Sequence, residues 1–167
     1  MNTIGSHPGA ILFRLSVMVI LIAILMVIFF DYFENSQRGI ERQSMTQTRK
    51  IIDSGLAVMF ASYAVNHRLA ELGQLDGGNP FEFLQDFDLL PPGYRGEIEV
   101  NLSAALDPGW YYLKHRRLVG YKTFYLETDV YYAVVLDYDD GNRNGRFEPD
   151  LDRFNSLRFV EVLELNR

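Results

Sequence analysis

The sequence predicts an α+β protein in which a long N-terminal helix packs on an antiparallel sheet of about five strands. Three observations support this fold class. Residues 10–30 contain 19 apolar residues in 21 positions. In the following stretch, apolar residues recur at the three- to four-residue spacing of one helical face. After residue 93 the spacing of apolar residues changes to two, which is typical of strands.

Residues 10–30 have the length and composition of a transmembrane helix. At about 1.5 Å per residue, 21 residues cross a hydrocarbon core of roughly 30 Å. The one charged residue, Arg14, lies one turn inside the N-terminal edge, from where its side chain can reach lipid head groups. A secretory signal peptide has a shorter apolar run, about 7–15 residues, followed by small residues. Here the run ends in Phe29, Phe30 and Asp31, so we expect an uncleaved anchor.

The charge distribution predicts the orientation of this anchor. No Asp or Glu precedes Asp31, and residues 31–167 carry 15 basic and 22 acidic residues, a net charge of −7 (15 minus 22). The positive-inside rule therefore places residues 1–9 in the cytoplasm as a short tail and residues 31–167 on the other side of the membrane. An acidic domain argues against nucleic-acid binding. The absence of cysteine excludes disulfides and thiol catalysis.

Beyond the membrane, residues 31–75 are predicted to continue the helix in amphipathic form. Gly73 and the loop at residues 76–80 are expected to end it. Residues 76–167 then form the sheet domain, which begins with a short helix or turn at residues 81–90. The apolar stripe of the long helix consists of Ile52, Leu56, Met59, Phe60, Tyr63, Leu69 and Leu72.

Five segments in the rest of the chain are predicted to be strands, joined by short and therefore mainly antiparallel connections. The first alternates at Ile98, Val100 and Leu102. The others are residues 110–113, 118–121, 130–138 and 157–165.

This layout resembles that of the type IV pilins and pseudopilins. The junction around Gly9 is similar to a prepilin leader, which a peptidase cleaves after a glycine. That family has a glutamate at the fifth position after cleavage, where this sequence has Arg14, so we expect the chain to remain uncleaved. Residues 108–121, with Trp110, Tyr111 and Tyr112, look like a hairpin of the MshF family. These are accessory proteins of the mannose-sensitive haemagglutinin (MSHA) pilus of marine gammaproteobacteria.

A polar segment at residues 140–151 resembles the opening of a calcium-binding loop. Its pattern D-x-N-x-N-G is rich in the oxygen ligands that Ca²⁺ prefers. The twelfth position should be acidic but is Leu151, so the expected affinity is weak. The alternative is a plain polar turn, because Asp-Gly and Asn-Gly are strong turn dipeptides. The candidate ligands are Asp140, Asn142, Asn144, Arg146 through its carbonyl, Glu148 and Asp150, with Asp152 flanking the loop.

Other candidate residues favour structural roles. His7, His67 and His115 are spread along the chain and are predicted to be solvated. No serine has a neighbouring base that would make it a nucleophile. The aromatic residues from Trp110 to Tyr132 are predicted to pack the sheet, and the basic run at residues 114–117 is predicted to be a solvated turn.

The resemblance implies a single-pass protein of the bacterial inner membrane with a periplasmic domain. It implies an accessory role in type IV (MSHA-like) pilus biogenesis through contacts with pilus subunits or assembly-platform proteins, without enzymatic activity. The alternative is a membrane-anchored periplasmic domain that senses a ligand or calcium through a partner. No cofactor is expected other than weakly bound Ca²⁺. A periplasmic hydrolase is disfavoured because no nucleophile–base set is recognisable.

We predict that alkaline phosphatase fused after Arg167 is active, because the acidic flank of the apolar segment is expected to cross the membrane. The measurement is phosphatase activity in whole cells, compared with a reporter that works only in the cytoplasm. Activity of the cytoplasmic reporter alone would contradict this orientation.

Overall fold

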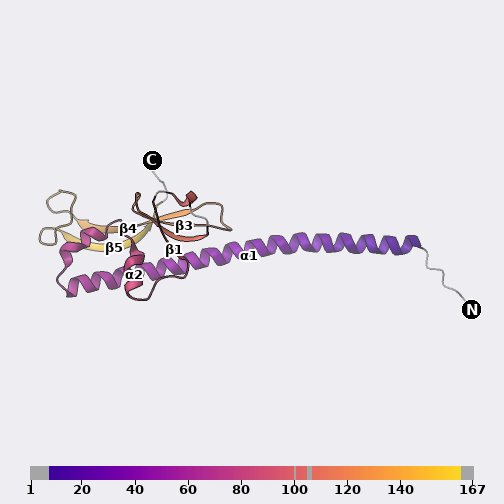
Figure 1. Cartoon of the computed structure of the whole chain (residues 1–167), viewed down its shortest axis with the longest axis horizontal. Coiled ribbons are helices and arrows are strands. Elements are labelled where there is room, and N and C mark those ends of the chain that lie inside the picture. Colours follow the sequence, from indigo (N-terminus) through magenta and orange to yellow (C-terminus); the bar gives the residue numbers. More distant parts are fainter. Residues whose placement is uncertain (1–7, 100, 105–106, 163–167) are drawn as a thin grey trace, which may run out of the picture. The chain divides into compact units, whose positions relative to one another are not determined.

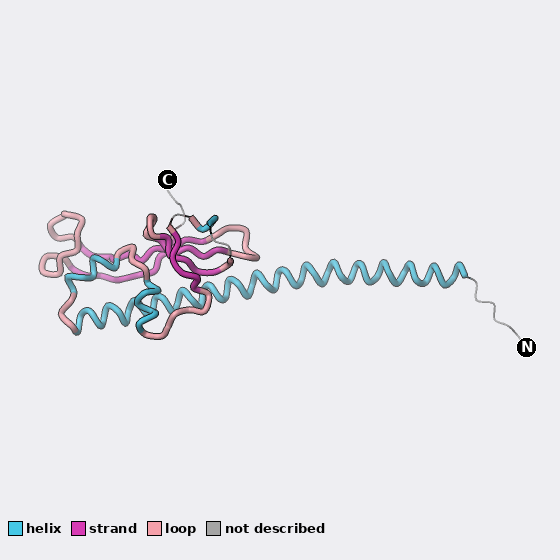
Figure 2. Tube along the Cα trace, in the orientation of Figure 1, coloured by secondary structure: helices cyan, strands magenta, loops and turns pink. Residues whose placement is uncertain are grey.

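The computed structural model describes residues 8–99, 101–104 and 107–162 and has two units, residues 1–40 and 41–167. One helix, α1 (Pro8–Val65), contributes residues to both units. Figure 1 follows the chain along its sequence, and Figure 2 shows its helices, strands and loops. The α+β class predicted from the sequence is confirmed, since a five-stranded and mostly antiparallel sheet follows the long helix.

The described part of the first unit, residues 8–40, is helical and is apolar over most of its length. Every large hydrophobic side chain from residue 11 to residue 33 is exposed, for example Ile11 at 50% and Phe30 at 63%. The most apolar window of the helix has a mean hydropathy of 3.0. By length and composition, the helix can cross a membrane.

Helix α1 ends at Val65, about ten residues earlier than the sequence predicted. His67 adopts a positive φ of 54°, and the amide of Arg68 donates to the carbonyl oxygen of Tyr63 at 2.9 Å. This is the hydrogen bonding of a helix that closes on a left-handed residue, a position usually taken by glycine. Here a histidine adopts it, so no glycine marks the end. Residues Leu69–Leu75 then form the 3₁₀ helix η1.

Helix α2 (Pro80–Asp86) packs on α1. Asn79 caps it by accepting a hydrogen bond from the amide of Phe81 at 3.0 Å, and Pro80 occupies its first turn. The close approach of the two helices requires Gly55. A Cβ at this position would lie 2.6 Å from Cδ2 of Leu84.

The sheet contains β1 (Tyr94–Ile98), β2 (Gly109–Leu113), β3 (Leu118–Lys122), β4 (Val130–Asp139) and β5 (Arg153–Glu161), in that spatial order. Three of the four neighbouring pairs are antiparallel, as predicted. The exception is the β1–β2 pair, which is parallel. The sheet is therefore mostly antiparallel, in agreement with the predicted mainly antiparallel connections, and its one parallel pair lies at the β1 edge.

The parallel pair forms because the chain crosses one face of the sheet between β1 and β2. This crossover includes the short 3₁₀ helix η2 (Leu102–Ala104), and Leu102 is fully buried there with Tyr111 and Leu113. A Cβ on Gly120 would lie 2.6 Å from Leu102, so the glycine makes room for the crossover. The sequence had assigned Ile98 and Leu102 to one strand, whereas β1 ends at Ile98. Val100 lies outside the described residues.

The opposite face of the sheet packs against residues 45–59 of α1 and forms the main core. The helix contributes Met45, Ile52, Leu56 and Met59 to this core. Trp110 is the central strand residue of the core, and its side chain is 1% exposed. Its ring makes aromatic contacts with Phe81, Tyr121, Tyr132 and Phe159. The predicted packing role of the aromatic residues is therefore confirmed for this face.

A buried carboxylate joins α1 to the connection between β3 and β4. Glu41 is 8% exposed, and its oxygens accept hydrogen bonds from the amides of Phe124, Tyr125 and Leu126 at 2.8, 2.9 and 3.1 Å. The hydroxyl of Tyr121 also donates to Glu41, at 3.4 Å. Burial and the charge of Glu41 raise the pKa of Tyr121 to about 12. The resulting contribution to stability is complete below pH ~10 and is lost as the pH rises towards 12.

Helix α1 also covers the outer edge of β5. The carboxylate of Asp53 accepts a hydrogen bond from the amide of Phe159 at 3.2 Å. Near the other end of the strand, the ring of Phe60 stacks on Phe154 with centroids 4.1 Å apart. The edge strand is therefore in contact with the helix at two separate points.

We predict that Glu41→Ala lowers the free energy of unfolding by about 2–3 kcal/mol, because three partly buried amides lose a charged acceptor. The measurement is thermal or denaturant unfolding of the full-length protein in detergent. Glu34→Ala is the matched control on the same helix, since it removes only an exposed ion pair with Arg38. Equal stability of the two variants would contradict this role for Glu41.

Candidate functional site

The predicted calcium loop lies between β4 and β5 (Figure 1). Asp140 organises its first turn. The two carboxylate oxygens of Asp140 accept hydrogen bonds from the amides of Asn144 at 3.2 Å and Gly145 at 2.7 Å. Gly145 has a φ of +71°, the left-handed conformation that the pattern assigns to its glycine. The opening of the loop therefore has the tight turn expected from the sequence.

Two asparagines and one glutamate form the centre of the loop. The side-chain oxygens of Asn142 and Asn144 accept hydrogen bonds from the amides of Asn144 and Arg146, at 3.0 and 2.8 Å. Their amide nitrogens donate to one carboxylate oxygen of Glu148, at 2.6 and 3.0 Å. In this arrangement the two amides solvate the negative charge of Glu148, a role that a bound cation would also serve.

Asp152 closes the loop, although the sequence placed it only beside the candidate ligands. It is 9% exposed, and its two oxygens accept hydrogen bonds from the amides of Gly141 and Glu148 at 2.9 and 2.7 Å. Gly141 is required there, because a Cβ would lie 2.5 Å from the carbonyl oxygen of Leu151. Asp150 is exposed to solvent. The structure thus brings Asp152, and not Asp150, into the hydrogen-bonded loop.

The loop can supply oxygen ligands, but its side chains already bond to its own backbone. Asp140, Glu148 and Asp152 are its ordered carboxylates, and burial together with Asp140 and Asp152 raises the pKa of the neighbouring Tyr138. Among the described residues, no group of three or more His, Asp or Glu side chains has a metal-binding arrangement. Calcium binding stays a prediction, as does the role of the Arg146 carbonyl.

The basic run at residues 114–117 is more ordered than predicted. Lys114 forms an ion pair with Glu97 at 2.8 Å, and His115 lies 3.5 Å from Glu99. The guanidinium of Arg117 donates to the carbonyl oxygen of Asp76. Three of the four residues therefore bind elements of the same domain. His67 is exposed at the end of α1, and His7 lies outside the described residues.

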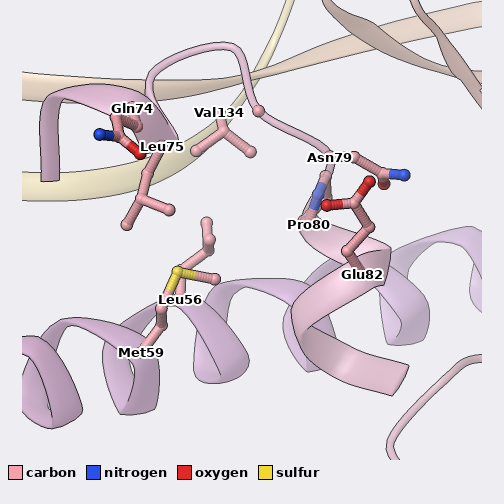
Figure 3. Close-up of a pocket in the computed structure, with 9 residues that line it drawn as sticks. Leu56, Met59, Gln74, Leu75, Asn79, Pro80, Glu82 and Val134 are labelled. Atoms are coloured by element: carbon pink, nitrogen blue, oxygen red, sulfur yellow. The ribbon is translucent and has the colours of Figure 1, made fainter. Parts of the chain in front are cut away.

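The sequence did not reveal a cavity of about 220 Å³ between α1, η1, α2 and β4 (Figure 3). Side chains from separate segments line it, so no local motif could have indicated it. The lining residues are Leu56, Met59, Gln74, Leu75, Gly78, Asn79, Pro80, Glu82 and Val134.

A search of protein-family models, curated proteins and solved structures found no match to this chain.

We predict that Ca²⁺ raises the melting temperature of the full-length protein in detergent relative to EDTA. We expect a Kd of roughly 10⁻⁴–10⁻³ M. At a Ca²⁺ concentration a hundredfold above this Kd, binding would raise the free energy of unfolding by about 2.7 kcal/mol. Asp140→Asn should remove the difference, since it retains an oxygen acceptor for the backbone but lacks the charge.

Asp86→Asn, an exposed acid on α2, is the control and should keep the calcium effect. Superimposable melting curves of the unmodified protein with Ca²⁺ and with EDTA would establish the loop as a self-contained turn.

Proposed function

We propose that this chain is a single-pass accessory component of type IV pilus biogenesis in the bacterial inner membrane. In this proposal residues 31–167 lie in the periplasm and act by binding pilus subunits or assembly-platform proteins. No catalytic step is part of the proposal. The observation that supports it best is one continuous helix, α1, with an exposed apolar N-terminal stretch and a C-terminal stretch that covers a mostly antiparallel sheet. This is the layout shared by type IV pilins and pseudopilins.

The hairpin of β2 and β3 adds support, since it includes the residues that resemble the MshF family. Trp110 of this hairpin lies at the centre of the core, and Tyr111 packs on the opposite face. The motif thus has a structural role in the sheet, which is consistent with a resemblance that extends to the fold of the domain.

Exposed apolar residues near α2 supply a surface for protein contacts. Val58 of α1 and Leu89 after α2 are 50% and 49% exposed, and both line a second hollow of about 330 Å³. Phe87 is 48% exposed in the same segment. Exposed apolar side chains grouped around a hollow are typical of protein interaction sites.

A sensing domain is the second candidate function, and the ordered acidic loop is the observation that favours it. Signal output would then require a partner in the membrane or the cytoplasm. The calcium experiment above addresses this alternative.

Deletion of the gene is expected to abolish assembly of MSHA-type pili and surface attachment, and a plasmid copy should restore both. A Leu89→Asp copy should restore them less well, because it places a charge in the apolar hollow. Electron microscopy of pili and an attachment assay measure the outcome. Normal pili in the deletion strain would refute the proposal.

A further inference from the structure

The cavity in Figure 3 has an apolar side and a polar side. The ends of Leu56 and Met59 from α1, Leu75 from η1 and Val134 from β4 converge on it. Leu56, Met59 and Val134 are at most 3% exposed, so the walls belong to the packed core and have few alternative positions. The cavity is thus preformed, and its apolar side can accommodate a short hydrocarbon chain. The polar side includes Gln74, Asn79 and Glu82.

The rim of the cavity is acidic. Glu82 is its one charged lining residue, and Figure 3 shows the carboxylate near Asn79 and Pro80 at the start of α2. Asn79 and Pro80 fix the start of α2 and therefore the place from which Glu82 projects. Among the ion pairs of the described residues, none includes Glu82, whereas the nearby Lys114 is paired with Glu97.

The surrounding segment strengthens this negative charge. Residues 69–93 contain five acidic residues and no Lys or Arg. Two basic side chains bind this segment: the guanidinium of Arg68 binds Glu71, and that of Arg117 donates to the carbonyl oxygen of Asp76. A ligand with a positive group is therefore favoured at the opening, and an anionic ligand or an anionic lipid is disfavoured.

The size of the cavity indicates a single side chain. About 220 Å³ is below the roughly 300–1,000 Å³ of most small-molecule sites. Lysine combines a four-carbon apolar stem, which can lie along apolar walls, with one terminal charge.

We propose that this pocket binds the side chain of a lysine presented by a partner protein, with the stem among Leu56, Met59, Leu75 and Val134 and the ammonium group at Glu82. The inference rests on the proposed function, because it specifies the chemistry of the partner that the domain would contact.

The test uses full-length protein in lipid nanodiscs with ¹³C-methyl methionine. Of its five methionines, Met59 lines the pocket, while Met45 is buried in the same core away from it. Titration with Nα-acetyl-lysine N-methylamide should shift the Met59 resonance in a saturable manner and leave that of Met45 unchanged. High salt should weaken this binding.

Three variants and one analogue make the result specific. Glu82→Gln should weaken binding about threefold, the scale of a partly exposed ion pair, and Leu75→Phe should abolish it by filling the cavity. Asp88→Asn removes a charge from the same segment outside the pocket and should bind normally. The unchanged Met45 resonance shows that each variant is folded.

No saturable shift of Met59, or equal affinity for the blocked norleucine analogue that lacks the ammonium group, would overturn the inference. Binding of free pentylamine but not of blocked lysine would also overturn it, since a free amine would then be the ligand. None of these results affects the deletion experiment, so the pocket and the pilus role are tested separately.

Discussion

The packing of residues 41–65 of α1 on the sheet is the interaction on which the rest of the domain depends. Each fully buried side chain at this interface, such as Ile52 or Leu56, contributes about 1.5–3 kcal/mol. Polar contacts at intervals along the helix then determine where neighbouring elements attach. Glu41 binds the β3–β4 connection and Asp53 binds β5. Gly55 has no side chain and so leaves room for α2 to pack closely on α1.

Much of this arrangement could be predicted from local patterns. The apolar run and the stripe at Ile52, Leu56 and Met59 specify the helix, because a buried helical face requires that spacing. Strands β2, β3 and β4 follow from runs of aromatic and β-branched residues. Asp140 and Gly145 were likewise predictable as parts of one turn, since the spacing of acidic, amide and glycine residues determines such a loop.

The remaining features depend on contacts between distant residues. A positive φ at His67 ends α1 without the glycine that usually marks a helix end. The parallel β1–β2 pair depends on Leu102 fitting over Gly120, which no local periodicity reveals. Asp152 joins the loop only because the chain folds back to place Gly141 beside it. The pocket lined by Met59 is formed by α1, η1, α2 and β4, and none of these segments contains a local motif that indicates a pocket.

The contact between α1 and β5 limits how this domain can assemble with other chains. An edge strand with free amides can add a strand from a neighbouring molecule and extend the sheet into a fibre. At β5, however, Asp53 occupies the amide of Phe159, and Phe60 covers Phe154. A neighbouring chain that paired with β5 at this point would have to displace Asp53 from the amide of Phe159. Extension of the sheet at the centre of β5 would therefore compete with the contact between α1 and β5 that also holds the core together.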